Sequence, residues 1–394
     1  MKLFKKPIDF LFIYKLQLKS NIFNKNKVMP AFKNQHFVPQ CYLRPFGNKD
    51  QEKAKSINLF NLRSHKLIEN APIKNQCSKD YFYGKDLHIE KLLHDFEGSY
   101  AELCRKILSN PTYQIDESDK NCLLNFWHVQ YIRTELYVKE ALLSFEQIVH
   151  DNELQNLIDK SFLNQEQTTK VIMQNTDLAD LFLKDLNCIL IRNNTPVPFI
   201  TSDNPAVLTN RYHFKKDLFR YFSFGLNSAG VILILPLSPK VCFFAYDKDI
   251  YTIPHKNKIL NLKKALDVEL INQFQISNCN YNLYLNEIFS FEKYYQKYLN
   301  QRLNSRYKVN YAILDDTNHG YKTYKLIPTS QISDHRDKEM MIHQSNLYPK
   351  PAIWPSFLHW HIRGYAYSAD SGAGHVREKY KYLLNSQRVH KVRI

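Results

Sequence analysis

Apolar side chains recur at helical spacing through much of the first half of the chain. Between residues 85 and 108 they fall three or four positions apart, which lines them up along one side of a helix. A second helix is predicted over 118–150, and Asp116 or Ser118 is placed to cap its start. A third helical region is predicted over 164–186.

Short apolar segments bounded by Pro, Asn, Ser and Asp follow. They are typical of buried strands, and the tight connection between the last two predicts a hairpin. The segments are 188–192, 198–201, 230–236 and 241–246. Helices are expected again at 262–284 and 288–304, and a last pair of strands at 311–314 and 321–326.

Extended structure is also predicted near the N-terminus. Residues 36–46 are interrupted by Pro39 and Pro45, which a helix interior does not tolerate. Residues 56–62 alternate between polar and apolar, as a strand does. Helices followed by strands and then helices indicate an α+β fold, helix-rich with a small mixed or antiparallel sheet.

Composition limits the class of protein. Apolar residues make up 44% of the 394 residues and aromatic residues 14%, enough for a sizeable core. No apolar run approaches the roughly 18 residues that a membrane-spanning helix needs. The seven cysteines form no CxxC pair and their number is odd, which indicates free thiols in a reducing compartment. We therefore expect a cytoplasmic protein.

The net charge of +16 is concentrated at the ends of the chain. Residues 1–28 hold seven Lys against one Asp, and residues 329–394 hold ten Lys and Arg against five Asp and Glu. Residues 29–328 carry only +5. The predicted organisation is a basic N-terminal extension (1–28), a main domain (29–328) and a basic C-terminal extension of unknown structure (329–394). Nucleic acid is a candidate partner, although the nearly balanced main domain argues against it.

The first candidate cluster comprises His36, Gln40 and Arg44. In an extended chain, a spacing of four places all three side chains on the same side. An imidazole beside a guanidinium suits acid–base chemistry and phosphate recognition. The alternative is a structural network in which Gln40 and Arg44 bond backbone carbonyls.

The second cluster lies on the first long helix, where Glu90, His94 and Glu97 share one face. Paired carboxylates can share a proton or hold a divalent metal, the one cofactor that the sequence suggests. The alternative is an ordinary solvated helix face.

The third cluster is Gln130 and Arg133, flanked by the aromatic residues Trp127 and Tyr131. These neighbours place the pair near the core, where a guanidinium requires a carboxylate. Glu97 on the preceding helix is the predicted partner. Such a pair is a structural tie as often as a functional site.

The fourth cluster follows a predicted strand, in the segment 201–205. Asp203 is a candidate metal ligand or general base, and Asn204 a candidate substrate contact. An Asx turn before Pro205 would explain both residues without any chemistry.

Familiar catalytic and nucleotide-binding motifs are missing. The sequence contains no GxGxxG, GxxxxGK[ST], HExxH or GxSxG. This argues against the common nucleotide-binding folds, zinc proteases and α/β-hydrolases.

Five segments occur in an order that resembles the domain-of-unknown-function family 4238, over roughly residues 30–305. The segments are HFVPQCYLRPF, DYFYGKDLHIEKLLHDFE, FWHVQYIRT, PFITSDNPAV and ILPLSP. The resemblance implies recurrent polar positions at His36, Gln40, Arg44, Glu90, Glu97, Gln130, Arg133, Asp203, Asn204 and Asn272. Family members often carry Pro where this chain has Glu135, so we expect the helix to continue through that point here. The resemblance implies no activity.

Two functions stay open. The first is an enzyme acting on a phosphate-bearing substrate, most simply a nuclease-like hydrolase. His36 would act as general acid or base, and Asp203 and Glu97 as base or metal ligands. The substrate contacts would be Gln40, Arg44, Gln130, Arg133 and Asn204. The second is a non-catalytic binding or sensing module, for example in defence or stress response, in which the same residues form a structural network.

Overall fold

A computed structural model describes most of the chain. The described residues are 33–47, 53–85, 88–150, 164–174, 181–215, 223–287, 296–301, 303, 307–318, 321–335, 338–369, 374–384 and 388–394. The predicted basic extension over 1–28 lies outside them. None of the helices in these ranges is both long and apolar enough to cross a membrane.

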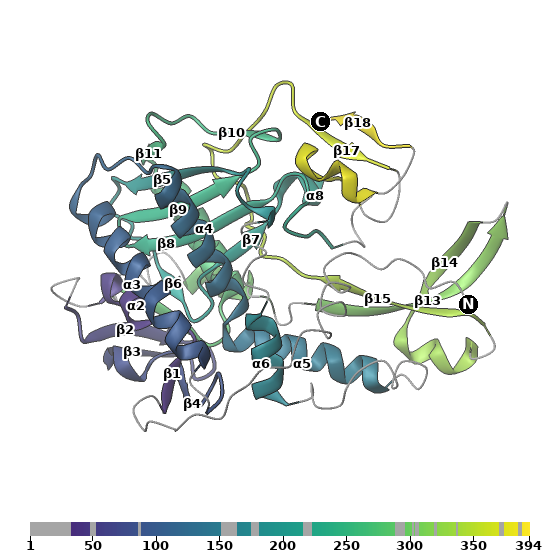
Figure 1. The fold of residues 1–394 in the computed structure, drawn as a ribbon, viewed down its shortest axis with the longest axis horizontal. Helices are drawn as coiled ribbons and strands as arrows, with labels where there is room; N and C mark the ends of the chain where they lie inside the picture. Colours follow the sequence, from purple (N-terminus) through teal and green to yellow (C-terminus); the bar gives the residue numbers. More distant parts are fainter. Residues whose placement is uncertain are drawn as a thin grey trace.

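A five-stranded mixed sheet forms the centre of the molecule (Figure 1). Its strands, in spatial order, are β11 (Ile259–Leu262), β5 (Asn187–Asn193), β9 (Val241–Tyr246), β8 (Ile232–Ser238) and β7 (Val207–Thr209). Only β11 and β5 run parallel; the other neighbours are antiparallel. The predicted hairpin is confirmed as β8–β9.

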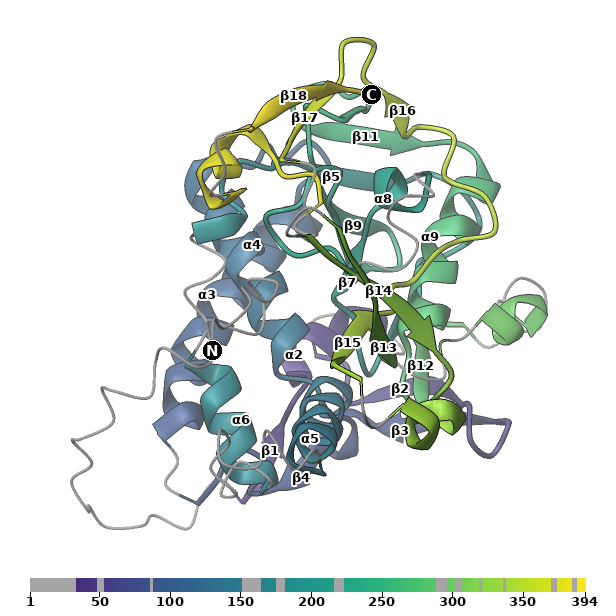
Figure 2. The same cartoon turned by 90° about the vertical axis from the view of Figure 1, so that its right-hand side faces the viewer.

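Helices cover both faces of this sheet, because its strands are apolar on both sides. The helices α3 (His88–Ser109) and α4 (Glu117–Ile132) pack on one face, and α9 (Ala265–Asn278) packs on the other (Figure 2). Along β8, Leu233 and Leu235 point to the first layer, and Ile232 and Ile234 to the second.

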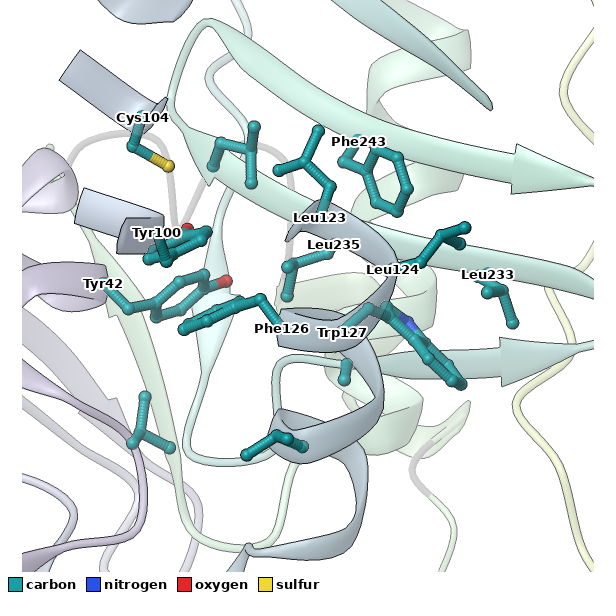
Figure 3. Close-up of a cluster of buried hydrophobic side chains, with 14 of the residues drawn as sticks. Tyr42, Tyr100, Cys104, Leu123, Leu124, Phe126, Trp127, Leu233, Leu235 and Phe243 are labelled. Carbon is teal, nitrogen blue, oxygen red and sulfur yellow. The ribbon is translucent and has the colours of Figure 1, made fainter. Parts of the chain in front are cut away.

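Aromatic side chains fill much of the core beneath α3 and α4 (Figure 3). Tyr100 of α3 stacks on Phe126 of α4, with ring centroids 3.4 Å apart. The buried Tyr42 hydroxyl donates to the Pro236 carbonyl oxygen of β8 at 2.7 Å, and Trp127 donates to the Ile234 carbonyl at 3.3 Å. The polar ends of these rings therefore fix the helices to the sheet without leaving a buried donor unpaired.

A four-stranded antiparallel sheet lies beside this body. It is ordered β3 (Lys66–Pro72), β2 (Ser56–Asn61), β12 (Asn282–Leu285) and β6 (Thr201–Ser202). A short ladder pairs β1 (Asn34–His36) with β4 (Ser78–Asp80). The α+β class is confirmed. In place of the single small sheet that the sequence predicted, the strands form several sheets.

The segment predicted to be extended over 36–46 is mostly helical after His36. It forms α2 (Gln40–Leu43) and the 3₁₀ turn η3 (Arg44–Phe46). Pro39 is the N-cap residue of α2, and Pro45 lies in the first positions of η3. Proline is tolerated there because these positions need no intrahelical N–H bond.

The helix predicted over 118–150 is interrupted at its centre. It ends as α4 at Ile132 and resumes as α5 (Glu135–His150). Thr134 Oγ1 accepts the Tyr137 amide at 3.4 Å and so caps the new start. The expected continuation through Glu135 is wrong, because a cap forms one residue before it. At the other end, Asp116 makes the predicted cap.

The remaining elements are short, apart from one three-stranded antiparallel sheet. That sheet is ordered β14 (Tyr321–Ile327), β13 (Tyr307–Asn318) and β15 (Met340–Asn346), and it contains the strand pair predicted at 311–326. The short elements are η4 (Ile73–Asn75), α6 (Gln165–Met173), α8 (Arg211–Lys215), β10 (Tyr251–Thr252), η9 (Gln296–Gln301) and η10 (Thr329–His335). Helices predicted over 164–186 and 288–304 are therefore observed only in part among the described residues.

The C-terminal residues fold back onto the main domain. Strand β16 (His359–Trp360) pairs with β10, and β17 (Tyr365–Ser368) pairs with β18 (His390–Arg393), next to η11 (Glu378–Leu384). Arg377 reaches the main domain through an ion pair with Asp185 at 2.7 Å. The described residues of the segment without predicted structure thus contact the main domain through β16 and Arg377 (Figure 1).

Candidate functional site

The site is built around Arg133, which ends α4. Its side chain is fully buried, and Nη1 donates to Glu97 Oε1 of α3 at 2.7 Å. Its Nε donates to Gln130 Oε1 at 2.9 Å. Burial would lower the pKa of Arg133, but the neighbouring Glu97 carboxylate and Tyr83 raise it above its ordinary value, so the guanidinium stays charged. The predicted Glu97–Arg133 pair is confirmed.

The same end of α4 holds the strand that carries His36. Gln130 Nε2 donates to the Phe37 carbonyl oxygen at 2.9 Å. From the other side, the Tyr83 hydroxyl donates to the His36 carbonyl oxygen at 3.1 Å. These two bonds bracket His36, so the strand end cannot shift without breaking buried hydrogen bonds.

His36 is half-buried, and its Nε2 lies 3.2 Å from the Lys74 carbonyl oxygen. In the tautomer protonated at Nε2, this bond leaves Nδ1 as a free proton acceptor. Burial lowers the pKa of His36; the charge of Glu97 raises it and that of Arg133 lowers it. His36 is therefore neutral at pH 7 and lies within the electrostatic field of the ion pair.

Glu90 lies two helical turns before Glu97 on α3, and it is also half-buried. Burial, and then the negative charge of Glu97, raise the pKa of Glu90 to about 7. Near neutral pH, Glu90 thus exchanges a proton readily while His36 is a neutral base. The charges of Glu97 and Arg133 act on both His36 and Glu90. Titratable groups of one site whose pKa values are displaced in opposite directions are typical of acid–base sites.

One nitrogen of the Arg133 guanidinium lacks a hydrogen-bond acceptor among the described residues. Arg133 Nη2 is buried and has no hydrogen-bond partner among the described residues. A buried donor without an acceptor is costly, so such a group in a native protein calls for an explanation. An anionic oxygen of a ligand would satisfy it, since guanidinium binds carboxylate and phosphate through paired N–H groups.

Asp203 belongs to a different set of contacts. Its Oδ1 accepts the backbone amide of Asn280 at 2.8 Å, and its Oδ2 accepts those of Tyr281 and Asn282 at 2.7 and 3.0 Å. Burial raises the pKa of Asp203, while these three amides oppose that rise. The carboxylate therefore fixes the loop between α9 and β12, and nothing in the structure places it with His36 and Glu97.

The predicted substrate contact Asn204 also bonds within the protein. It accepts the Thr134 hydroxyl at 2.8 Å and donates to the Asn278 carbonyl oxygen at 2.9 Å. Asn272 accepts the Ile200 amide and donates to the Pro198 carbonyl. These amides connect α9 and the end of α4 to the segment around β6.

The remaining predicted residues lie further from this hub. Arg44 is exposed, Gln40 is half-buried, and His94 is exposed on the solvent side of α3. The structure thus brings together His36, Glu90, Glu97, Gln130 and Arg133. Arg44 lies at the edge of this group, since its charge and those of Glu97 and Arg133 all act on the pKa of Cys41. Asp203 bonds the loop before β12 instead.

Two residues of this arrangement were not predicted from the sequence. Tyr83 holds the His36 backbone, and Thr134 caps α5 while bonding Asn204. The segment DYFYG around Tyr83 was part of the family resemblance and could have drawn attention to it. For Thr134, the signal was its position directly after Arg133, where a helix cap is often a threonine.

The described residues contain no group of three or more His, Cys, Asp and Glu that could hold a metal ion. Glu90 and Glu97 therefore stand as a carboxylate pair without a third acidic, histidine or cysteine ligand in that part of the chain. Their surroundings suit proton exchange and the binding of an anion.

Comparison with known proteins identifies the family but no relative of known function. No curated protein and no solved structure gives a significant match. A family model described as "Protein of unknown function (DUF4238)" matches residues 34–289, a range that includes the whole cluster around Arg133. The chain therefore belongs to the DUF4238 family.

Proposed function

We propose that this protein is an enzyme acting on a phosphate-bearing substrate, a nuclease-like hydrolase whose centre is the cluster of His36, Glu90, Glu97 and Arg133. One observation carries the proposal. Two groups that can exchange protons near neutral pH gather around a buried guanidinium that has one nitrogen unpaired.

The chemistry follows from the charge state of each group. Neutral His36 accepts a proton from the attacking water or hydroxyl, and protonated Glu90 donates one to the leaving oxygen. Arg133 offers its unpaired Nη2 to a phosphate oxygen, where negative charge develops in the transition state. Positioned acid–base groups of this kind contribute about 10²- to 10⁴-fold each to the rate.

The roles differ from those expected from the sequence. Glu97 holds Arg133 in place through their 2.7 Å contact, and it also raises the pKa of Glu90. Asp203 has no role in this mechanism, because backbone amides engage both of its oxygens. Arg44 is exposed and can assist substrate binding only from the surface.

A non-catalytic binding or sensing module is the second candidate. It is favoured by the polar residues that bond within the protein, since Gln130, Asp203, Asn204 and Asn272 all engage backbone groups. On this alternative the recurrent polar positions preserve the fold, and His36 and Glu90 sense a bound anion without chemistry.

We place the protein in the cytoplasm, and nucleic acid is its proposed substrate class. The seven cysteines all lie among the described residues and form no disulfide there, as is usual in a reducing compartment. The excess positive charge supplies non-specific attraction to phosphate.

The test is a cleavage assay with RNA, single-stranded DNA and duplex DNA, each with Mg²⁺, Mn²⁺ or EDTA. His36→Ala and Glu90→Gln are expected to lower the rate about 10²-fold or more. His255→Ala, which changes an exposed histidine shortly before β11, is the matched control and should keep full activity. The EDTA lanes report whether a divalent metal takes part.

Two results would decide against an enzyme. If the wild-type protein cleaves none of the substrates, the binding or sensing module becomes the better account. If it cleaves a substrate and His36→Ala, Glu90→Gln and His255→Ala all cleave equally well, the chemistry lies elsewhere in the chain.

A further inference from the structure

The β17–β18 hairpin near the C-terminus has two unlike faces. In its register, Tyr365 lies opposite Arg393 and Tyr367 opposite Lys391, so these four side chains share one face. Ala366 and Ser368, on the other face, are buried against the protein. The face that carries the tyrosines therefore points outward.

The two tyrosines are held in a fixed arrangement. Both hydroxyls donate to Glu378 of η11, at 2.8 Å from Tyr365 and 3.2 Å from Tyr367. The ring centroids are 6.1 Å apart, and both rings remain partly exposed. Glu378 thus binds the polar tips, and the two rings meet edge to face at an interplanar angle of 86°, so each can offer a face of its own to a base.

Cations surround these rings. Lys391 Nζ lies 3.5 Å from the centre of the Tyr365 ring, and Lys381 Nζ lies 5.2 Å from that of Tyr367. Arg393 is exposed beside them. We call Tyr365, Tyr367, Lys381, Lys391 and Arg393 the tyrosine face.

The charge of the whole segment reinforces this pattern. Residues 349–394 contain eight Lys and Arg against two Asp and Glu, and Glu378 is already engaged by the tyrosine hydroxyls. Of these basic residues, Lys391 and Arg393 lie on β18 and Lys381 lies on the neighbouring η11 (Figure 2), whereas Arg377 is buried.

We propose that the tyrosine face binds single-stranded nucleic acid, with unpaired bases on Tyr365 and Tyr367 and phosphates on Lys381, Lys391 and Arg393. Neighbouring rings on a strand are the usual platform for splayed bases, and flanking cations follow the backbone. A duplex keeps its bases stacked inside and cannot use the rings. An anionic membrane would use the cations but has no need of paired aromatic rings.

This inference does not depend on the proposed hydrolase. The tyrosine face and the cluster around Arg133 share no residue, and the readout is binding alone. A protein that binds without cleaving would support this site and count against the enzyme.

The test measures binding of fluorescein-labelled oligo(dT) and oligo(U) by fluorescence anisotropy, with probe integrity checked on a gel. Lys391→Ala with Arg393→Ala should weaken binding about tenfold and reduce the slope of log affinity against log salt by about 1.4, because each lost phosphate contact on a single strand contributes roughly 0.7. The matched control is Lys66→Ala with Lys74→Ala, which changes exposed lysines on and beside β3, far from the hairpin (Figure 1).

Two substitutions of Tyr367 separate the contribution of its ring from that of its hydroxyl. Tyr367→Leu should weaken binding by about 5- to 150-fold, because the stacking of one base on an aromatic ring contributes a factor of that size to the affinity. Tyr367→Phe loses the same bond to Glu378 but keeps the ring, and it should bind like wild type. Thermal melts of all variants show whether each is folded.

Several outcomes would overturn the proposal. They are no wild-type binding at 50 mM salt, equal affinity for a duplex, equal affinity of the tyrosine-face and control variants, or binding only to vesicles containing phosphatidylserine. Equal weakening by Tyr367→Leu and Tyr367→Phe would count against stacking in the same way.

Discussion

Arg133 and Arg377 are buried to the same extent, yet the protein satisfies them differently. Their side chains are 0% and 2% exposed, and each lies 2.7 Å from a carboxylate that is about a quarter exposed. Arg377 donates through all three nitrogens, to Asp185 and to the carbonyl oxygens of Phe182, Leu226 and Ser228. Among the described residues, Arg133 donates to Glu97 and Gln130 and lies against the Tyr83 hydroxyl, but its Nη2 has no acceptor in hydrogen-bond geometry.

The difference separates a structural arginine from a candidate functional one. Every donor of Arg377 is used to attach the C-terminal segment to the main domain, so the residue has no capacity left for a ligand. Arg133 retains a buried donor beside His36 and Glu90, at a cost in stability that a purely structural tie would avoid. Burial alone would not have distinguished them.

The largest expected effect is on Arg377. Arg377→Met should lower the free energy of unfolding by about 4–5 kcal/mol, because it leaves Asp185 and three buried carbonyls without a donor. Chemical denaturation measures this change. Arg363→Met, at an exposed position, is the control and should cost about 0.5 kcal/mol or less.

Arg133→Met should cost less, about 3 kcal/mol, because one of its nitrogens makes no bond that could be lost. Activity or anion binding should disappear even under conditions where the variant is fully folded. Arg105→Met, at an exposed position on α3, is the control. The distinction between the two arginines would disappear if Arg133→Met lowered the free energy of unfolding as much as Arg377→Met does and left function intact in the folded fraction.

A substitution of Asp203 tests whether this residue, one of the polar positions that the family resemblance implies, has a structural role. Asp203→Asn should destabilise the protein by about 2 kcal/mol, because an amide replaces one of the oxygens that accept backbone N–H groups. Specific activity per folded molecule should be unchanged. The exposed change Asp95→Asn is the control, and an activity loss confined to Asp203→Asn would return this residue to the site.

The smallest effect, and the one that depends on pH, concerns Glu90. Its pKa is raised to about 7 from an unfolded value near 4.3, so the folded protein binds more protons between these values. The stability contributed by protonated Glu90 is therefore present below about pH 4.3 and is lost as the pH rises through 7.

Glu90→Gln should remove this pH dependence and stabilise the protein at pH 8 by about 1–2 kcal/mol, a figure reduced for solvent screening of a half-buried group. At pH 4 it should have little effect. Melting temperatures of wild type and variant at both pH values provide the measurement, with the exposed Glu69→Gln as control. Equal shifts at pH 4 and pH 8 would show that Glu90 titrates normally.

The sequence by itself determined the features that depend on neighbours along the chain. Apolar spacing gave α3 and α4, the turn after β8 gave the hairpin with β9, and Asp116 gave the cap of α4. It also determined the Glu97–Arg133 pair, because an arginine among aromatic residues requires a carboxylate and the preceding helix supplied one. Proline, in contrast, was read as excluding a helix, although Pro39 and Pro45 occupy the helix starts that tolerate it.

Only the tertiary structure decided which polar residues are available for chemistry. Asp203 bonds amides 77 to 79 positions away, Thr134 bonds Asn204 across 70 positions, and Arg377 meets Asp185 across 192. Local periodicity carries no information about such partners, since they are set by how the layers pack. Folding places backbone amides on both oxygens of Asp203 and leaves Glu90 beside the like charge of Glu97, so the two carboxylates differ in their availability for chemistry.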